Sequence, residues 1–352
     1  MENLINDFFE FGEKNNYTPI ERSNLISPFF KDEFNLSAGH QILMPAILSS
    51  TPQPVRRIIV NEPCLRRVDF EKLGASNIHL LLFEMGVFGI FGEKGNEDDH
   101  RYNILNDCIN FLKRINLRGD NIFFSVSKGA KISNHEFEAD KKSLELLIDL
   151  GIKEDNIVQT YGRQNFIFSK GDKRPSGYSI EIFYKHDDQF IEIGSINIYE
   201  YIFIDNAFTK NDINFGIGCG FGFERLKSII DEKYSVYELE MYKNIIEQFK
   251  NRFSYMNFLI VKERILKIIE LSKTLMFVFL DGQLPDKSAH GKIMKQFLSK
   301  LRSEINYLNL NENDLFRIMD MLFICYISRY NFNQIVKEEF KTLLKNEIFK
   351  TN

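Results

Sequence analysis

Apolar side chains recur at the spacing of an amphipathic helix at the beginning of the chain and through its last third. Residues 1–16 show this spacing through Leu4, Ile5 and Phe8, which predicts an N-terminal helix. From about residue 230 onward the pattern is helical to the end. The same spacing predicts individual helices at residues 102–116, 140–151, 259–280, 291–301 and 315–330.

Alternating apolar and polar residues predict strands in the middle of the chain. Residues 178–184 and 190–199 alternate with the period of two that a strand gives its side chains. Residues 122–126 predict a further short strand. Residues 58–67 and 78–85 predict the two arms of a hairpin-like pair, joined by a polar loop.

Proline and glycine mark the connections between these elements. Residues 37–41 form a predicted turn, which leads through residues 42–45 to a proline-punctuated link at residues 51–54. Pro63 lies within the first arm of the hairpin-like pair. Since proline cannot donate to a strand ladder, it indicates a sheet edge or a bulge there.

Residues 215–222 carry a glycine at every second position. The glycines are Gly216, Gly218, Gly220 and Gly222, and Ile217, Cys219 and Phe221 stand between them. A strand with this pattern has one apolar face and one bare face. Because glycine weakens a strand, such a row needs a reason, and a flat charged ligand such as a nucleotide lying on the backbone supplies one. A crowded strand crossing in a core is the alternative.

Charged and aromatic residues near these strands suit a nucleotide. A helix start follows the glycines and places Arg225 in a first turn whose free N–H groups favour anions. On the second hairpin arm, His79 and Phe83 share one face, where they can contact phosphate and stack on a base. A buried aromatic ring beside a hydrogen-bonded histidine is the alternative. Glu181 and Glu192 are carboxylates in otherwise apolar strands, where they need a partner or a metal such as Mg²⁺.

Length and composition describe an ordinary soluble globular protein. The chain has 352 residues, 44% of them hydrophobic and 27% charged, which suggests about two domains. It has no apolar run of transmembrane length, and its N-terminus lacks the basic and apolar regions of a secretion signal. Its four cysteines are scattered without metal-binding spacing, which argues against a disulfide framework or zinc site and favours the reducing cytoplasm.

The charge is unevenly spread along the chain. The net charge is −4, and it divides into about −10 for residues 1–240 and about +6 for residues 241–352. A basic helical half can dock phosphates, although such charges more often form a solvated face.

Several of these motifs together resemble the class II aminoacyl-tRNA synthetases. The Gly-x-Gly-x-Gly-x-Glu-Arg run resembles motif 3, and Arg66 followed by His79-x-x-x-Phe83 resembles motif 2. Within the class the chain is most similar to alanyl-tRNA synthetases. That similarity is carried by Ser37-Ala38-Gly39, Cys64-Leu65-Arg66, Leu82-Phe83-Glu84-Met85, Gly171-Asp172, Glu181-Ile182-Phe183-Tyr184, Ile191-Glu192-Ile193, Asp281-Gly282-x-x-Pro285 and Gly291.

This resemblance implies an α+β fold with a class II synthetase-like antiparallel sheet flanked by helices, followed by an all-α C-terminal domain. Residues 1–232 would form the adenylation domain. Residues 233–352 would form a helical domain like the tRNA-recognition domain of the alanyl enzymes. The chain also stops before the editing and C-terminal domains of those enzymes, which implies a truncated paralogue.

The resemblance further implies how ATP is bound. Arg66 would hold the α-phosphate and the charge that develops as a carboxylate attacks it, so catalysis would rest on Arg66 and Arg225. Phe83 would stack on one side of adenine and Arg225 on the other. His79 would touch the γ-phosphate region.

The remaining ATP contacts implied by the resemblance are backbone and metal contacts. Gly220 and Gly222 would lie against the nucleotide. Glu192, together with Glu181, would coordinate Mg²⁺. Pro28 would match the proline of motif 1.

The amino-acid pocket departs from the alanyl pattern. Gly218 stands where those enzymes place an aspartate that grips the substrate's amino group, and Ile167 replaces their pocket tryptophan. Ser195 ends the pair that replaces Trp-Asn, and Asn197 replaces a valine. Losing a buried partner for an ammonium group costs about 3 kcal/mol or more, so alanine bound in the usual way is not expected.

The tRNA side departs from that pattern as well. Ala289-His290-Gly291 occupies the place of the asparagine that helps to read the acceptor stem, and the next helix offers only Lys292, Lys295 and Lys300. The sequence therefore predicts an ATP- and Mg²⁺-dependent, amino-acid-activating ligase that has kept adenylation and has an altered amino-acid pocket, so its acyl substrate is an amino or related acid that the sequence does not name. Its acceptor is a tRNA, a carrier protein or a small molecule. The alternative is a non-catalytic paralogue that binds amino acid or RNA. No membrane partner is expected, and the chain is a monomer or a homodimer.

Overall fold

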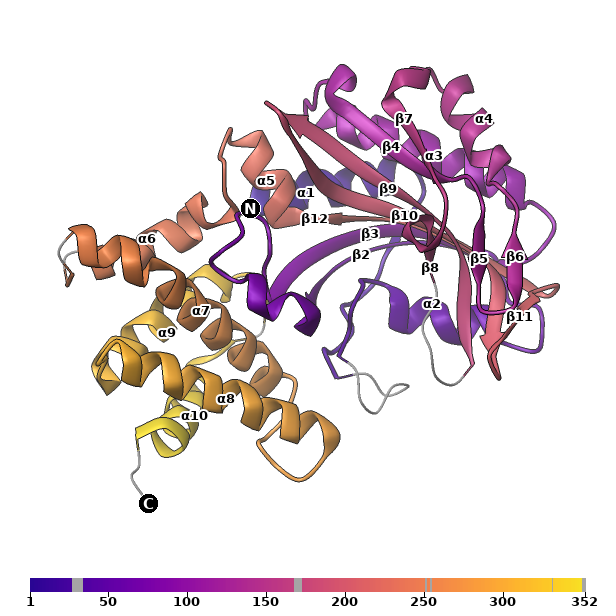
Figure 1. Cartoon of the computed structure of the whole chain (residues 1–352). Coiled ribbons are helices and arrows are strands. Elements are labelled where there is room, and N and C mark those ends of the chain that lie inside the picture. Colours follow the sequence, from indigo (N-terminus) through magenta and orange to yellow (C-terminus); the bar gives the residue numbers. More distant parts are fainter. Residues whose placement is uncertain (27–33, 168–172, 251, 254, 331, 350–352) are drawn as a thin grey trace. The chain divides into compact units, whose positions relative to one another are not determined.

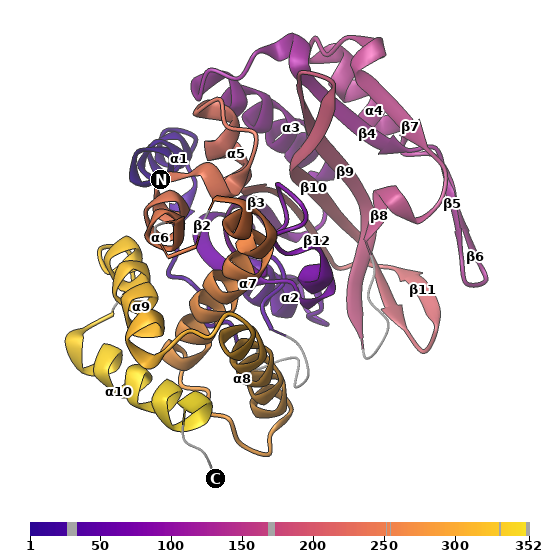
Figure 2. The same cartoon turned by 60° about the vertical axis from the view of Figure 1, so that its left-hand side comes forward.

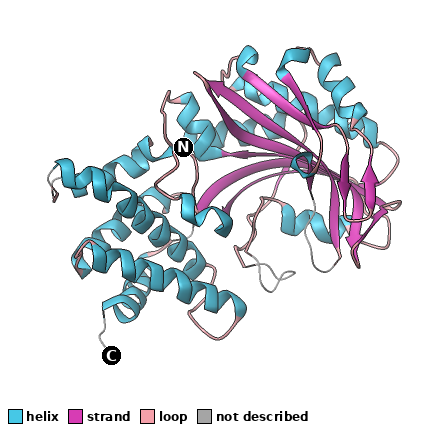
Figure 3. Cartoon of the chain, in the orientation of Figure 1, coloured by secondary structure: helices cyan, strands magenta, loops and turns pink. Residues whose placement is uncertain are grey.

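The computed structural model describes residues 1–26, 34–167, 173–250, 252–253, 255–330 and 332–349, which form two compact units. Unit 1 carries most of the strands and unit 2 is mostly helical (Figures 1 and 3). Unit 1 comprises Met1–Ser23, Ser37–Glu62 and Glu84–Asp231, and unit 2 comprises Asn24–Leu36, Pro63–Phe83 and Glu232–Asn352.

The large sheet runs in the order β1-β2-β3-β12-β10-β9-β4-β7, with β11 paired to β10 and β8 to β9. Its strands are β1 (Thr18–Pro19), β2 (Arg56–Leu65), β3 (Leu82–Glu93), β4 (Ile122–Ser127), β7 (Ile157–Thr160), β8 (Phe166–Ile167), β9 (Arg174–His186), β10 (Gln189–Ile204), β11 (Ala207–Lys210) and β12 (Asn214–Gly222). The central neighbours β3, β12, β10, β9 and β4 pair antiparallel, whereas β1 with β2 and β4 with β7 pair parallel. A separate small sheet pairs β5 (Ala130–Ile132) with β6 (His135–Phe137). The predicted α+β class with a mainly antiparallel sheet is confirmed.

Helices cover both faces of this sheet (Figures 1 and 2). On one face lie α1 (Glu2–Lys14), α3 (Glu97–Arg114), α4 (Lys141–Asp149) and α5 (Phe223–Ile230). Ile217, Cys219 and Phe221 of the glycine strand are fully buried on that face. The ring of Phe221 lies 5.2 Å from that of Phe111 in α3. The predicted apolar face of β12 therefore packs into the core of unit 1.

The opposite face carries α2 (His40–Ile47), where the sequence predicted only a turn and a proline-punctuated link. Pro45 lies inside this helix and lacks the N–H that would bond to the preceding turn. The helix forms nevertheless because it buries Leu43, Met44 and Ile47. Gly39 begins it with a φ of 70°, and the buried Glu62 carboxylate accepts the Gly39 N–H at 2.7 Å.

Unit 2 contains five α-helices in the part that the structure describes. They are α6 (Glu240–Lys250), α7 (Tyr255–Leu280), α8 (Ala289–Tyr307), α9 (Glu312–Tyr326) and α10 (Gln334–Leu344). The helix α7 packs against each of the others and forms the centre of the unit (Figure 2). Short helical turns complete both units: η1 (Arg67–Lys72), η2 (Gly119–Asn121), η3 (Glu154–Asn156), η4 (Arg163–Asn165), η5 (Val236–Glu238) and the π-helical η6 (Lys345–Phe349). Within the described residues, no helix combines the length and apolar character that crossing a membrane requires.

The turn between α7 and α8 and the first turn of α8 explain two of the motif glycines. Gly282 adopts a φ of 87°, which favours glycine. A Cβ at Gly291 would lie 1.9 Å from Oδ1 of Asp286, so only glycine fits there. The Gly291 N–H in turn donates to the Ser288 hydroxyl, which caps α8.

Residues 63–83 belong to unit 2 because side chains and turns of that unit hold their backbone. Glu270 of α7 accepts the Leu81 N–H at 2.9 Å, and the Tyr237 hydroxyl donates to the His79 carbonyl at 2.8 Å. Val236 donates its N–H to the Asn77 carbonyl. These bonds replace strand pairing, so β3 begins at Leu82 and not at the predicted residue 78.

The change of unit after Asp231 lies next to the predicted domain boundary at residue 232. Two earlier segments, Asn24–Leu36 and Pro63–Phe83, also belong to unit 2. A single domain boundary along the sequence cannot describe this division. The assignment of residues 1–232 to adenylation and 233–352 to tRNA recognition stays a prediction.

Candidate active site

The bare face of the glycine strand gathers several predicted site residues within unit 1. Gly218 lies opposite Asn197 of β10, and Gly220 lies opposite Ser195. Ser195 lies in turn opposite Glu181 of β9. Because directly opposed residues of an antiparallel pair point to the same face, these five residues share one surface of three neighbouring strands.

A small cavity opens on this surface. It measures about 10 Å³, which is about the space that one water molecule requires. Its lining residues are all uncharged: Ser37, Ala38, Leu43, Met85, Val87, Ser195, Asn197, Tyr199, Gly218 and Gly220. Three of the four predicted substrate-binding residues, Ser195, Asn197 and Gly218, are among them.

The space at each glycine distinguishes a ligand surface from a crowded strand crossing. A Cβ at Gly216 would lie 2.5 Å from Cδ1 of Ile47, so crowding explains that glycine. Gly220 is tight, with Met85 Cε and Val87 Cγ2 both at 3.0 Å. At Gly218 the nearest atoms are at ordinary contact distance, 3.7 Å, and at Gly222 at 4.0 Å. Packing within the protein therefore accounts for only part of the glycine row.

Ile167, the fourth predicted substrate-binding residue, lies in β8 opposite Gly177 of β9. It packs, partly buried, against a cluster that contains Leu43 and Tyr199, two residues that line the cavity. It thus adjoins the cavity lining without being part of it. Pro28, Gly171 and Asp172, which also carried the resemblance, lie outside the described residues.

Arg225 and Glu192 meet at one end of this surface. The Arg225 Nη1 donates to the Glu192 carbonyl at 2.9 Å and lies 3.6 Å from Oε1 of the Glu192 carboxylate. A bulge in β10 follows directly, between Glu192 and Gly194. The Glu192 side chain is 42% exposed, so its carboxylate is accessible to a ligand or a cation.

The residue before Arg225 sets its position. The fully buried Glu224 carboxylate accepts the Glu84 N–H with both oxygens, at 3.0 and 3.1 Å. This pair of bonds fixes the first turn of α5 against β3. Sequence reasoning singled out Arg225 and missed this supporting role, although the adjacent carboxylate in the Glu-Arg pair was a visible signal.

The two carboxylates predicted to hold Mg²⁺ lie on adjacent strands. Glu192 is opposite Phe183 and Glu181 is opposite Ser195, so the acidic residues are near neighbours in register. The Ser179 hydroxyl donates to Glu181 at 2.6 Å. Among the described residues, no three His, Cys, Asp or Glu side chains gather as a metal site. Two carboxylates fit Mg²⁺, which is commonly held by one or two of them together with substrate phosphates.

Arg66, His79 and Phe83 lie in unit 2. The Arg66 side chain is exposed, and the backbone N–H of Arg66 donates to the Leu81 carbonyl at 3.0 Å. The His79 Nδ1 lies 2.6 Å from the Ser76 hydroxyl, and its Nε2 lies 3.4 Å from the Lys72 ammonium. Phe83 is partly buried. The predicted ATP residues thus form two groups, one in each unit, and the clamp of Phe83 with Arg225 stays a prediction.

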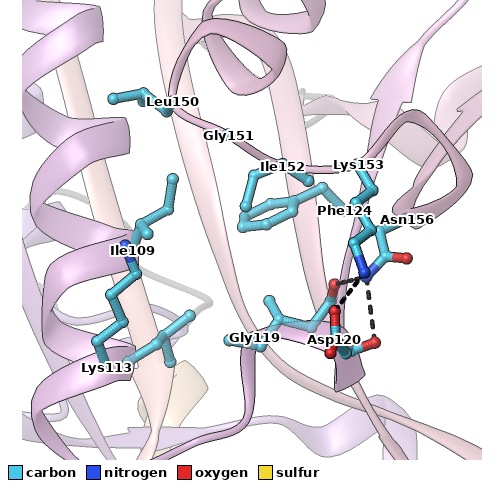
Figure 4. A pocket seen from close by; sticks show the side chains of 12 residues that line it. Ile109, Lys113, Gly119, Asp120, Phe124, Leu150, Gly151, Ile152, Lys153 and Asn156 are labelled. Carbon is cyan, nitrogen blue, oxygen red and sulfur yellow. Dashed lines mark hydrogen bonds and ion pairs between the residues drawn. The ribbon is translucent and has the colours of Figure 1, made fainter.

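A second cavity in unit 1 lies between α3, β4 and the segment after α4. Figure 4 shows Ile109, Phe124 and Ile152 facing this space of about 250 Å³. At one side Lys153 pairs with Asp120 at 2.6 Å. No residue predicted to bind ATP or amino acid lines it, so it is separate from the glycine surface.

Comparison with known proteins places these features in a family. The sequence model of "tRNA synthetases class II (A)" matches residues 3–349. The alanine–tRNA ligase of Leptospira biflexa is 21% identical over 373 residues, covering 99% of this chain and 38% of its own length. That of Rickettsia felis is 22% identical over 352 residues, covering 91% of this chain and 37% of its own length.

The chain therefore spans less than two fifths of the length of these relatives. Among solved structures, apo histidyl-tRNA synthetase of S. aureus matches with a TM-score of 0.44 and 13% identity. That match covers 68% of each chain.

Proposed function

Since the chain belongs to the class II tRNA synthetase family, we propose that it activates an amino acid with ATP and transfers the acyl group to an acceptor. The observation that carries this proposal is the surface beside β12. There, packing does not require the glycine at position 222, since a Cβ at Gly222 would lie 4.0 Å from Cδ of Arg225, whose side chain contacts Glu192. A strand end without side chains, partly exposed at Gly222, next to a fixed guanidinium and an accessible carboxylate suits a nucleotide with its cation.

In the proposed reaction a substrate carboxylate oxygen attacks the α-phosphorus of ATP. The bond from that phosphorus to the bridging oxygen breaks, giving an acyl-adenylate and pyrophosphate. Arg66 would stabilise the charge on the α-phosphate, because preorganised charge is usually the main catalytic contribution in such transfers. His79 would contact the γ-phosphate region, and Phe83 and Arg225 would hold adenine.

Glu192 and Glu181 are the residues that would hold Mg²⁺. The ion would neutralise charge on the phosphates of ATP when bound. Arg225 bonds to the backbone carbonyl of Glu192 at 2.9 Å and forms a longer ion pair of 3.6 Å with its carboxylate, which is 42% exposed and therefore accessible to the ion.

The uncharged residues around Gly218 support an altered amino-acid pocket. Ser195 and Asn197 offer a hydroxyl and an amide, and Gly218 offers no side chain at all. A substrate ammonium would meet neutral acceptors there and not an ion-pair partner. We therefore propose a small amino or hydroxy acid that is not bound as alanine is in the alanyl enzymes.

The acceptor is proposed to be a tRNA, a carrier protein or a small molecule. The positively charged C-terminal third favours tRNA. We place the reaction in the reducing cytoplasm, in keeping with four scattered cysteines that form no disulfide.

A non-catalytic role in binding amino acid or RNA is the second candidate. It is favoured by the absence of a carboxylate at position 218, because a paralogue that no longer activates alanine has no need of one.

Exchange of pyrophosphate into ATP, measured with Mg²⁺ over a panel of amino and hydroxy acids, tests the proposal. We expect exchange with at least one small acid. Calorimetry with ATP and Mg²⁺ separates the two candidates. Failure to bind ATP, together with no exchange for any acid, would rule out the ligase and leave the non-catalytic role.

A further inference from the structure

A further candidate binding site in unit 1 is the cavity between α3, β4 and the segment that follows α4, named here the α3–β4 cavity. It measures about 250 Å³. An apolar cavity of about 150 Å³ is large enough to hold benzene, so the α3–β4 cavity has room for a chain or ring of about ten carbon atoms.

The sheet separates this cavity from the glycine surface. Phe124 of β4 lies opposite Ile182 of β9, and the next residue, Ser125, lies opposite Glu181. Successive residues of a strand point to opposite faces, so Phe124 faces away from the surface that carries Glu181. A ligand beside Phe124 therefore lies on the other side of the sheet from the proposed nucleotide and does not compete with it.

The wall of the cavity is largely apolar. Gly119 and Gly151 are also part of the lining, and a Cβ at either would meet no atom beyond its chain neighbours within 4 Å. The space is thus not filled by the protein itself, and an apolar group that enters it leaves water for hydrocarbon surroundings. The apolar lining residues are Ile109, Leu112, Ile122, Phe124, Leu150 and Ile152.

The charged groups of the lining lie on two sides of this wall (Figure 4). Lys113 lies beside Ile109 on α3, whereas Asp120 and Lys153 pair with each other at 2.6 Å on the other side. Within the residues that the structure describes, Lys113 forms no ion pair. Two lysines and one aspartate give the lining a net charge of +1. A ligand with one negative charge balances it, whereas a phosphate monoester, with about two, exceeds it.

A solvated lysine beside a water-filled groove is the alternative. Lys142 is an ordinary surface lysine of this unit and pairs with Asp98 at 2.8 Å. Lys113 differs because its side chain borders an apolar space. Water fills such a space poorly, since an enclosed water molecule needs about two to four polar partners.

We propose that the α3–β4 cavity binds a small monocarboxylic acid with an apolar body. The hydrocarbon part packs against Ile109, Phe124 and Ile152, and the carboxylate accepts a hydrogen bond from the Lys113 ammonium. The binding is non-covalent and requires no ATP. It goes beyond the proposed adenylation and does not depend on it.

The test titrates heptanoate into the full chain and follows the isoleucine methyl groups by NMR. Heptan-1-ol and heptylamine have the same chain with no charge and with a positive charge. We expect saturable binding of heptanoate with a Kd of about 1 mM or tighter, the range open to a ligand of so few atoms. The shifts should be confined to Ile109, Ile122 and Ile152. Ile167, which packs beside the other surface, should not move.

Three variants separate the contributions of charge and contact. Lys113→Gln should weaken heptanoate by about fivefold or more and leave heptan-1-ol within about twofold, because only the acid loses a charged partner. Lys141→Gln changes an exposed lysine of α4 outside the lining and should leave both affinities unchanged. Ile152→Ala should weaken the acid and the alcohol alike, by about threefold or more, because both lose apolar contact. Circular dichroism and thermal unfolding establish that the variants are folded.

Equal heptanoate affinity of the Lys113 and Lys141 variants would overturn the proposal. Shifts at Ile167 in place of Ile109 and Ile152 would also overturn it, because the acid would then occupy the glycine surface. Heptylamine that binds as tightly as heptanoate would show a cation site at Asp120 and would reject the acid. The titration contains no ATP, so its outcome is independent of whether the chain catalyses pyrophosphate exchange.

Discussion

Glu270 and Lys273, which are three residues apart on α7, form an ion pair of 2.7 Å in which both side chains are fully buried. The same Lys273 ammonium donates to the Tyr242 hydroxyl at 2.6 Å. The other Glu270 oxygen accepts the Leu81 N–H. The pair therefore ties the segment that carries Arg66 and His79 to the central helix of unit 2.

Replacement of Lys273 by alanine should destabilise unit 2 strongly. It leaves the Glu270 carboxylate buried without a cation, which typically costs about 3–5 kcal/mol. Urea unfolding followed by circular dichroism measures the change. Lys267→Ala is the matched control on the same helix, since Lys267 forms only a surface pair with Glu263 and should cost about 0–1 kcal/mol. Similar losses in the two variants would contradict the role assigned to the buried pair.

Elements long enough to repeat the side-chain spacing of a helix or a strand several times were predictable from the sequence. The predicted N-terminal helix is α1, and the two alternating segments are the central parts of β9 and β10. Short strands such as β5, β6 and β11 were not predicted, because three or four residues are too few to show a period. The helix α2 was missed because its stability comes from burial against the sheet and not from local preference.

For the candidate site, the sequence predicted which residues of one strand share a face, but not which residues of neighbouring strands lie opposite one another. The alternation of glycines gave the bare face of β12, but the register that sets Asn197 opposite Gly218 is fixed by strand pairing. Tyr199, Met85 and Val87 line the cavity and were missed for that reason. The α3–β4 cavity was missed as well, because the residues that form it come from separate segments between Ile109 and Asn156.

Arg66→Ala should abolish adenylate formation while the fold stays intact. Arg66 is exposed, so its removal leaves no cavity in the core. We expect pyrophosphate exchange to fall by about 100-fold or more, the typical effect of removing one group that stabilises developing charge. Arg67→Ala changes the neighbouring exposed arginine and should have little effect. Near-normal exchange in the Arg66 variant would refute the catalytic role.

Glu192→Gln should raise the Mg²⁺ concentration needed for half-maximal exchange. The substitution removes the carboxylate charge and with it the 3.6 Å ion pair with Arg225, but the shorter Arg225 bond to the backbone carbonyl of residue 192 is retained and holds the arginine. A magnesium titration of exchange activity measures the effect, and ATP binding without metal serves as the control. An unchanged magnesium requirement would show that this carboxylate does not contact the ion.

Gly218→Asp should shift the substrate profile toward alanine. The added Cβ meets Val87 and the Phe88 carbonyl only at 3.7 Å, so the strand can accept the Cβ, and the carboxylate points toward the cavity lined by Ser195 and Asn197. The new carboxylate would offer a substrate ammonium the charged partner that the uncharged cavity lacks, and a bond of that kind contributes about 1.5–3 kcal/mol. We therefore expect kcat/KM for alanine in pyrophosphate exchange to rise by about tenfold or more. Gly218→Ala separates charge from size and should not show the gain. An identical profile for the aspartate and alanine variants would mean that the ammonium group binds elsewhere.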